Sequence, residues 1–348
     1  MTNGGHEALN PLHPSVEARL DPVFAKLYTE QAANTPNGPI DLPKLRKNYS
    51  KLYSYGTAPA PEVADVKDVK IPSFDGEEIT LRVYRPDNAS QDTPLPVHMD
   101  FHGGGWGLGD LETESHILKH IVHQAKVVVI DVDYRLVPEY PFPTGLRDCF
   151  AALQHVHSHA DAFGVDPQSI SVGGVSAGGH ISLAVSHLAR DAGIPLVLCA
   201  VGTPQIDDIS GYEQAADSPF SSMREMEFAP TLNWARLKWF DTLKWDSLST
   251  DPETRKKQLQ DVGWFKNLLT APNFANLPRT LVYTAECDPM RDEGEAYAEK
   301  LRQAGNDVDL KRYPGVPHPF MHMDNALWQA KDFIDRTAKE IAKAHKTI

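Results

Sequence analysis

The stretch ISVGGVSAGGHISLAV, Ile170 to Val185, decides the fold of this chain. Its first half is an apolar run typical of a buried strand, and its second half has apolar residues at helical spacing. The glycines between them form G-x-S-x-G around Ser176, the pattern of a nucleophile on a sharp strand-to-helix turn. Such a turn needs small neighbours, because side chains there collide with the adjoining strand and helix. A glycine-rich turn with a serine also occurs at ordinary strand-to-helix corners, so Ser176 must be judged with its partners.

A second glycine-rich motif, HGGGW from His102 to Trp106, follows an apolar run upstream of Ser176. Consecutive glycines cost backbone entropy, which is explained if bare N–H groups must point into a pocket beside the nucleophile turn. We expect the N–H groups of Gly104, Gly105 and Ala177 to form an oxyanion hole. Gly103 and His102 are expected to shape and hold the loop. A generic glycine-rich loop is the alternative.

Short apolar runs alternate with helical stretches on both sides of these motifs. The runs that we predict as strands are VKDVKIPS, EEITLRVYRP, PVHMDF, VVVIDV, ISVGG, PLVLCAV, TLVYTAE and DLKRYP. Helices are predicted near 115–123 and 145–157. The first two runs, separated by Asp75 and Gly76, indicate an antiparallel edge, and the later rhythm indicates a mostly parallel sheet. The predicted class is therefore α/β, with about eight strands and helices on both faces.

Two segments depart from this rhythm. Residues 1–60 mix amphipathic pieces, such as Val16 to Thr29, with Pro and Gly, and we expect helices lying over another part of the chain. Residues 205–270 are rich in large side chains and are predicted to be inserted helices. We assign both segments to a helical cap, and residues 61–204 and 271–348 to the catalytic core. The large side chains of the insert are Met223, Met226, Phe228, Trp234, Trp239, Phe240, Trp245, Trp264 and Phe265.

Composition excludes several classes of protein. Lys and Arg total 34 against 47 Asp and Glu, and the net charge of -13 opposes binding to nucleic acid and to anionic membranes. No stretch approaches the roughly 18 apolar residues of a membrane span. The three widely spaced cysteines indicate free thiols rather than a disulfide framework or a CxxC metal site. Since neither end matches a targeting signal, a cytoplasmic location is expected. The oligomeric state, a homodimer included, stays open.

Two further residues complete a candidate catalytic set. Asp288 comes just after the predicted strand TLVYTAE, where catalytic groups collect in parallel sheets, and is the expected acid. Asp292 competes with it, but its spacing from Glu295 favours the N-cap of a capping box and a structural role. His318 follows the last predicted strand and is the expected base. The chain order Ser176, Asp288, His318 is the order typical of α/β-hydrolases.

Five segments in order resemble the signatures of the hormone-sensitive-lipase family of esterases. They are HGGGW, DYRLVPEYPFPTGLRDC, GVSAGG, DPMRDEG and YPGVPHPF. The resemblance covers about residues 65–335 and implies the α/β-hydrolase fold with a helical cap. It also places the acid at the first Asp of DPMRDEG. Two positions depart from the family pattern: Val175 stands where the family usually has Asp, and Pro319 where it usually has Gly.

The resemblance implies hydrolysis of small, short- to medium-acyl esters through an acyl-enzyme on Ser176. No cofactor is expected, and no metal, because HILKH from His116 to His120 lacks the glutamate of HExxH and a third ligand. Alternatives stay open. They are a hydrolase of specialised esters or lactones, a lyase or cyclase built on the same fold, and a small-molecule receptor, against which His318 argues. The natural substrate is not determined.

Overall fold

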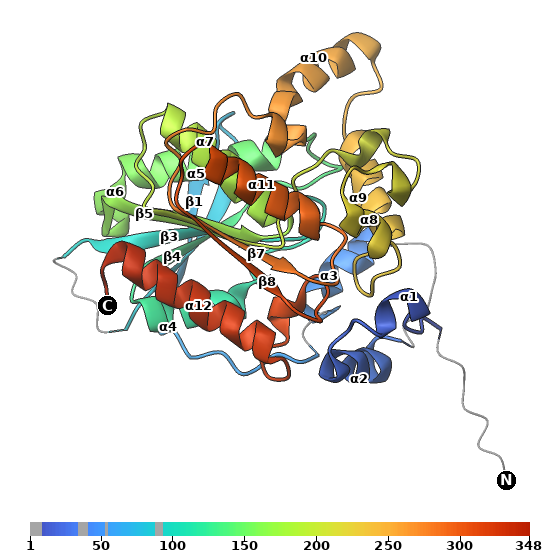
Figure 1. Ribbon diagram of the computed structural model, residues 1–348. Coiled ribbons are helices and arrows are strands. Elements are labelled where there is room, and N and C mark those ends of the chain that lie inside the picture. Colours follow the sequence, from blue (N-terminus) through green and yellow to red (C-terminus); the bar gives the residue numbers. More distant parts are fainter. Residues whose placement is uncertain (1–8, 34–40, 53–54, 88–92) are drawn as a thin grey trace.

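The computed structural model describes residues 9–33, 41–52, 55–87 and 93–348 (Figure 1). Within these residues one eight-stranded sheet has the order β1-β2-β4-β3-β5-β6-β7-β8. The strands are β1 (Asp65–Pro72), β2 (Glu78–Arg85), β3 (Leu95–Phe101), β4 (Val128–Asp133), β5 (Val165–Val175), β6 (Leu198–Gly202), β7 (Thr280–Ala285) and β8 (Val308–Tyr313).

Helices connect and cover these strands. The described α-helices are α1 (Pro14–Glu17), α2 (Pro22–Gln31), α3 (Leu42–Leu52), α4 (Ser115–Ala125), α5 (Thr144–Ser158), α6 (Ala160–Phe163), α7 (Ala177–Asp191), α8 (Ser221–Glu225), α9 (Trp234–Asp246), α10 (Pro252–Val262), α11 (Arg291–Gln303) and α12 (Trp328–His345). Short 3-10 helices lie at Ile209–Gly211, Ala215–Asp217, Gly263–Lys266, Leu268–Thr270 and Phe320–His322.

The sheet has the predicted mixture of directions. β1 and β2 form an antiparallel hairpin in which Asp65 pairs with Arg85, and β2 pairs antiparallel with β4. The remaining neighbours pair in parallel, from β4 through β3 and β5 to β8. Every run predicted as a strand overlaps one of the eight strands, and the predicted α/β class is confirmed.

Two apolar cores lie on the two faces of the sheet. On one face α4 and α12 pack together, with Ile121 and Ile334 in the same buried cluster (Figure 1). On the other face α5, α7 and α11 contribute Leu146, Ile181 and Leu301 to a second cluster. Because both faces are covered, the central parallel strands are apolar on both sides, as their continuous runs predict. The ends of the strands are then the parts of the sheet that these helices leave uncovered.

Most of the helices outside the α/β rhythm gather at one end of the sheet. Figure 1 shows α1, α2, α3, α8 and α9 beyond the end toward which β7 and β8 point. The amphipathic piece 16–29 is divided between α1 and α2, because Asp21 caps the start of α2 by accepting from the Val23 N–H at 2.8 Å. Residues 1–8, 34–40 and 53–54 of the N-terminal segment lie outside the described residues.

Part of the insert between β6 and β7 packs into the core of the sheet domain. Val262 and Leu268, near its C-terminal end, belong to the main apolar core. In the ranges that the structure describes, no helix is both long enough and apolar enough to cross a bilayer. Cys149, Cys199 and Cys287 are free and buried.

Candidate active site

Ser176 stands on the sharp turn between β5 and α7. Its backbone has φ 58° and ψ -118°, a conformation that L-residues adopt at a cost and that recurs at functional turns. Its N–H donates to the Gly202 carbonyl at 2.9 Å, which ties the turn to β6. A Cβ at Gly174 or Gly178 would collide with the Phe101 carbonyl. The close approach of β3 to the turn therefore requires the small neighbours that the motif supplies.

The acid and base candidates are brought together from two loops. Asp288 follows β7 and His318 follows β8, and the His318 Nδ1 lies 2.9 Å from the Asp288 Oδ2. Both side chains are buried. The other Asp288 oxygen accepts from the Met290 N–H at 2.9 Å, which fixes the carboxylate. With Nδ1–H donating to the carboxylate, the Nε2 of His318 is left as an acceptor, the tautomer that a general base requires.

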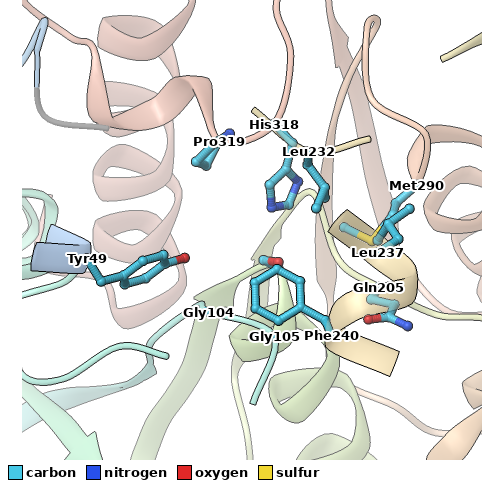
Figure 2. A pocket seen from close by; sticks show the side chains of 11 residues that line it. Tyr49, Gly104, Gly105, Gln205, Leu232, Leu237, Phe240, Met290, His318 and Pro319 are labelled. Carbon is cyan, nitrogen blue, oxygen red and sulfur yellow. The ribbon is translucent and has the colours of Figure 1, made fainter. Parts of the chain in front are cut away.

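Ser176 and His318 line the same cavity. Figure 2 shows the His318 ring directed into it from above. Within the described residues no hydrogen bond joins the Ser176 hydroxyl to the ring. Such contacts are often loose in ligand-free enzymes and tighten when substrate binds. The geometry therefore brings the predicted nucleophile and base to one site, with the acid behind the base.

Three backbone N–H groups, two on the cavity wall and one directly after Ser176, have no hydrogen-bond partner among the described residues. They belong to Gly104, Gly105 and Ala177. Gly104 and Gly105 have φ of 121° and 58°, and Ala177 is the first residue of α7, where N–H groups are unpaired and the helix dipole favours an anion. A Cβ added at Gly103 would lie 3.5 Å from the Cβ of Ser176, so the loop runs beside the nucleophile.

His102 and Gly103 hold the loop rather than face the cavity. The His102 ring stacks on Tyr134 with centroids 4.2 Å apart, and its Nδ1–H donates to the Gly103 carbonyl at 2.8 Å. Burial lowers the pKa of His102 to about 4, so the ring is neutral at pH 7. The Gly103 N–H donates to the buried Glu114 carboxyl at 3.3 Å, and burial raises the pKa of Glu114. Sequence reasoning missed Glu114, for which no local motif signals a role.

Asp292 has a structural role, but the predicted capping box is wrong. α11 begins at Arg291 with Met290 at the N-cap, so Asp292 lies inside the first turn. Its Oδ2 accepts from the Ser221 hydroxyl at 2.7 Å and from the Ser222 N–H at 2.8 Å. Asp292 therefore holds the start of α8 from another part of the chain. The partner expected in the box, Glu295, instead accepts from Thr284 and Arg312.

The cavity walls include residues that sequence reasoning did not single out. They are Tyr49, Gln205, Leu232, Leu237 and Met290. Tyr49 comes from α3, and Figure 2 shows its hydroxyl directed toward the cavity from the side opposite Gln205. Gln205 follows β6, and this position at the carboxyl end of a parallel strand was a usable signal. Leu232, Leu237 and Tyr49 carry no such signal.

Most of the large side chains of the insert do not reach the cavity. Of those that the sequence emphasised, Phe240 lines it and also packs over Gly105. Met223 and Trp234 belong to a small apolar cluster of the insert itself, and Trp245 and Trp264 pack on the main core. Large side chains in this insert are therefore mainly structural.

The paired histidines of α4 lie beside Asp324. The Nε2 atoms of His116 and His120 lie 3.9 and 4.0 Å from the Asp324 carboxylate. In the part of the chain that the structure describes, no group of three His, Cys, Asp or Glu residues is arranged to hold a metal ion.

A serine, a buried His–Asp pair and unpaired N–H groups around one cavity define the site of a serine hydrolase. A family model described as alpha/beta hydrolase fold matches residues 98–322. The AB hydrolase superfamily protein C1039.03 of Schizosaccharomyces pombe is 32% identical over 345 residues, covering 94% of each chain. The carboxylic ester hydrolase LipN of Mycobacterium tuberculosis is 36% identical over 271 residues, covering 76% of this chain and 67% of LipN.

Solved structures agree with these relatives. An esterase of Pyrobaculum calidifontis superposes with a TM-score of 0.80 at 31% identity, covering 93% of this chain and 98% of the esterase. This chain therefore belongs to the alpha/beta hydrolase family and, within it, to the hormone-sensitive-lipase group of esterases. The resemblance inferred from the five motifs is confirmed, and the chain is an ester hydrolase.

Proposed function

We propose that this chain hydrolyses small carboxylic esters with short to medium acyl groups, through an acyl-enzyme on Ser176. The observation that carries the proposal is that Ser176 and the His318–Asp288 pair meet at one cavity bordered by unpaired N–H groups. This cavity is lined in part by Leu232, Leu237, Phe240 and Met290. Its apolar walls favour hydrocarbon groups near the reacting carbonyl.

In the first half of the reaction, His318 Nε2 takes the Ser176 proton as the serine oxygen bonds to the ester carbon. The carbonyl electrons move to oxygen, and the N–H groups of Gly104, Gly105 and Ala177 bind the resulting oxyanion. Asp288 holds the imidazole in its tautomer and stabilises the imidazolium. When the tetrahedral species collapses, the bond to the alcohol oxygen breaks, and His318 returns its proton to that oxygen.

In the second half of the reaction, water is the nucleophile and the Ser176 oxygen is the leaving group. His318 takes a proton from water as the water oxygen bonds to the acyl carbon, and the proton then returns to the Ser176 oxygen as the acid leaves. This step separates hydrolysis from a lyase or cyclase, which uses the oxyanion hole without an acyl-enzyme.

The assignment of cap and core belongs to the same proposal. Residues 1–60 and 205–270 form the cap, and residues 61–204 and 271–348 form the core. Tyr49 from the first cap segment and Leu232, Leu237 and Phe240 from the second border the cavity, which supports a role in enclosing the substrate. The proposed partner is a small-molecule ester. Nucleic acid is not a proposed partner, because the net charge of -13 opposes binding to it. The proposed location is cytoplasmic.

Labelling with a fluorophosphonate tests the nucleophile. The wild-type chain is expected to react at Ser176 and to lose esterase activity, whereas Ser176→Ala neither reacts nor turns over p-nitrophenyl butyrate, a loss of about 10⁶-fold. Mass spectrometry of a rapidly quenched reaction should find the acyl group on the peptide that contains Ser176. Ligand binding without labelling would point to a receptor, and turnover without an acyl-serine would point to lyase or cyclase chemistry. Either result overturns the proposal.

A further inference from the structure

Gln205 lies in the cavity wall beside the nucleophile, and its backbone is fixed by the nucleophile turn. Its N–H donates to the Ser176 carbonyl at 3.4 Å, and its own carbonyl accepts from the His180 Nδ1–H at 3.1 Å. The residue is buried, and its side chain lines the cavity together with Ser176. The position of this amide relative to the reacting serine is therefore set by the core of the enzyme.

The orientation of the amide is also set. The Gln205 Nε2 donates to the buried Asp207 carbonyl at 3.3 Å. Since a carbonyl can only accept, the nitrogen must face Asp207 and the oxygen must face the other way. Figure 2 shows this arrangement, with the oxygen on the side of Phe240 and the nitrogen directed away from it.

Asp207 is held by several hydrogen bonds, so movement of Asp207 does not let the Gln205 amide rotate. Its carboxylate accepts from the Asn267 amide at 2.6 Å and from the Tyr212 hydroxyl at 2.9 Å. Its N–H donates to the buried Glu293 at 3.3 Å. This network leaves the Gln205 carbonyl oxygen as a preorganised acceptor in the cavity wall.

The surroundings make this acceptor costly to cover with hydrocarbon. Leu237, Met290 and Phe240 line the same cavity, and no described residue donates a hydrogen bond to the Gln205 oxygen. A polar atom covered by an alkyl chain loses its hydrogen bond to water and gains none. Sites that present a fixed hydrogen-bonding group discriminate against substrates that lack the matching group.

Resting on the proposed ester hydrolysis, we infer that the preferred substrates are hydroxylated esters whose O–H donates to the Gln205 carbonyl oxygen. Gln205 is then a specificity-determining residue. A purely aliphatic ester of the same length enters the cavity but leaves this acceptor unpaired. One neutral hydrogen bond to a partly enclosed acceptor changes kcat/KM by about tenfold.

Matched ester pairs test the inference with the full chain. Ethyl butanoate is compared with ethyl esters of β- and γ-hydroxybutanoic acid, and butyl acetate with the monoacetate of butanediol, so that both the acyl and the alcohol sides are sampled. Wild type is expected to prefer one hydroxylated ester by about tenfold in kcat/KM. Gln205→Met, which keeps the side-chain length without the amide, should abolish that preference.

The readout is the ratio of two kcat/KM values in one variant, which general damage to the fold does not change. The control is Gln303→Met, the same substitution on an exposed position of α11, and it should keep the wild-type ratio. If Gln205→Met does not fold, Gln205→Asn withdraws the carbonyl by one methylene and serves the same comparison. The inference is wrong if wild type prefers no hydroxylated ester, or if the preference survives in the Gln205 variant.

Failure of the inference and failure of the proposed function give different results. If the chain cleaves both members of each pair with equal kcat/KM, ester hydrolysis stands and the role of Gln205 is refuted. If it cleaves no ester and does not react with the fluorophosphonate, the proposed function itself is refuted, and the inference falls with it.

Discussion

The two walls of the cavity are built in different ways. The strand-end wall consists of Gly104, Gly105, Ser176, Gln205, Met290, His318 and Pro319, which follow strands of the sheet. The helical wall consists of Tyr49, Leu232, Leu237 and Phe240, which come from α3, from α9 and from the loop before α9. The first wall carries the proposed reacting groups, and the second is mainly apolar.

The difference between the two walls separates the positioning of the reacting groups from the choice of substrate. Residues at the ends of paired strands are held by the hydrogen-bond ladder of the sheet, so their side chains keep the precise positions that proton transfer requires. Residues on surface helices are held by packing alone, and packing tolerates changes of shape. Substitutions of the proposed reacting groups in the strand-end wall should therefore lower turnover of every ester. Substitutions in the helical wall, and of Gln205 as inferred above, should mainly change which ester is preferred.

The largest effect among the supporting residues is expected from Asp288→Asn. Loss of the carboxylate removes the group that fixes the His318 tautomer, and kcat should fall by about 10⁴-fold for all esters. Asp292→Asn is the matched control, since it weakens the contact of α11 with Ser221 and Ser222 and should lower thermal stability while kcat stays within a few-fold of wild type. Steady-state kinetics and melting curves of both variants decide the matter. The reverse pattern would make Asp292 the acid.

A smaller effect is expected from Gly104→Ala in the oxyanion loop. The added Cβ would collide with the Leu108 carbonyl, which displaces one proposed oxyanion donor, and kcat should fall by about 10²- to 10³-fold. Gly193→Ala is the control, because Gly193 also has a positive φ, of 71°, but a Cβ there meets nothing within 4 Å. It should cost stability and leave kcat unchanged. Equal losses of kcat in the two variants would argue against the oxyanion assignment.

The smallest effect is expected at Thr231, which lies next to the helical wall in the sequence and contacts His318 of the strand-end wall. Thr231, beside Leu232 of the helical wall, has a φ of 70° and donates its hydroxyl to the His318 carbonyl. Thr231→Val keeps the shape and loses the donor, so kcat should fall by about three- to tenfold for all esters. Thr231→Ser keeps the hydroxyl and should retain kcat. A change in KM alone, or a change confined to long acyl chains, would assign Thr231 to substrate packing instead.

Four residues of the strand-end wall could be singled out from the sequence because each follows a local pattern. Ser176 lies in G-x-S-x-G, Gly104 and Gly105 lie in HGGGW, and His318 follows the last apolar run. The capping box predicted at Asp292 was wrong, although the spacing between Asp292 and Glu295 fits the rule. The start of α11 is set by Asp288 and the backbone around it, since the Arg291 N–H donates to the Asp288 carbonyl at 3.2 Å. The spacing from Glu295 alone does not contain that contact.

Apolar periodicity and the placement of glycines therefore determined the order of strands along the chain, the α/β class and the candidate reacting residues. These features depend on residues within a few positions of one another, and a single sequence contains them. Only the tertiary structure decided that Tyr49 and Gln205 face one cavity, that Glu114 holds Gly103, and that the Gln205 oxygen rather than its nitrogen is exposed there. Each of these depends on contacts between distant segments. The position of Gln205 after β6 signals the strand end, but long-range packing decides which way each side chain faces.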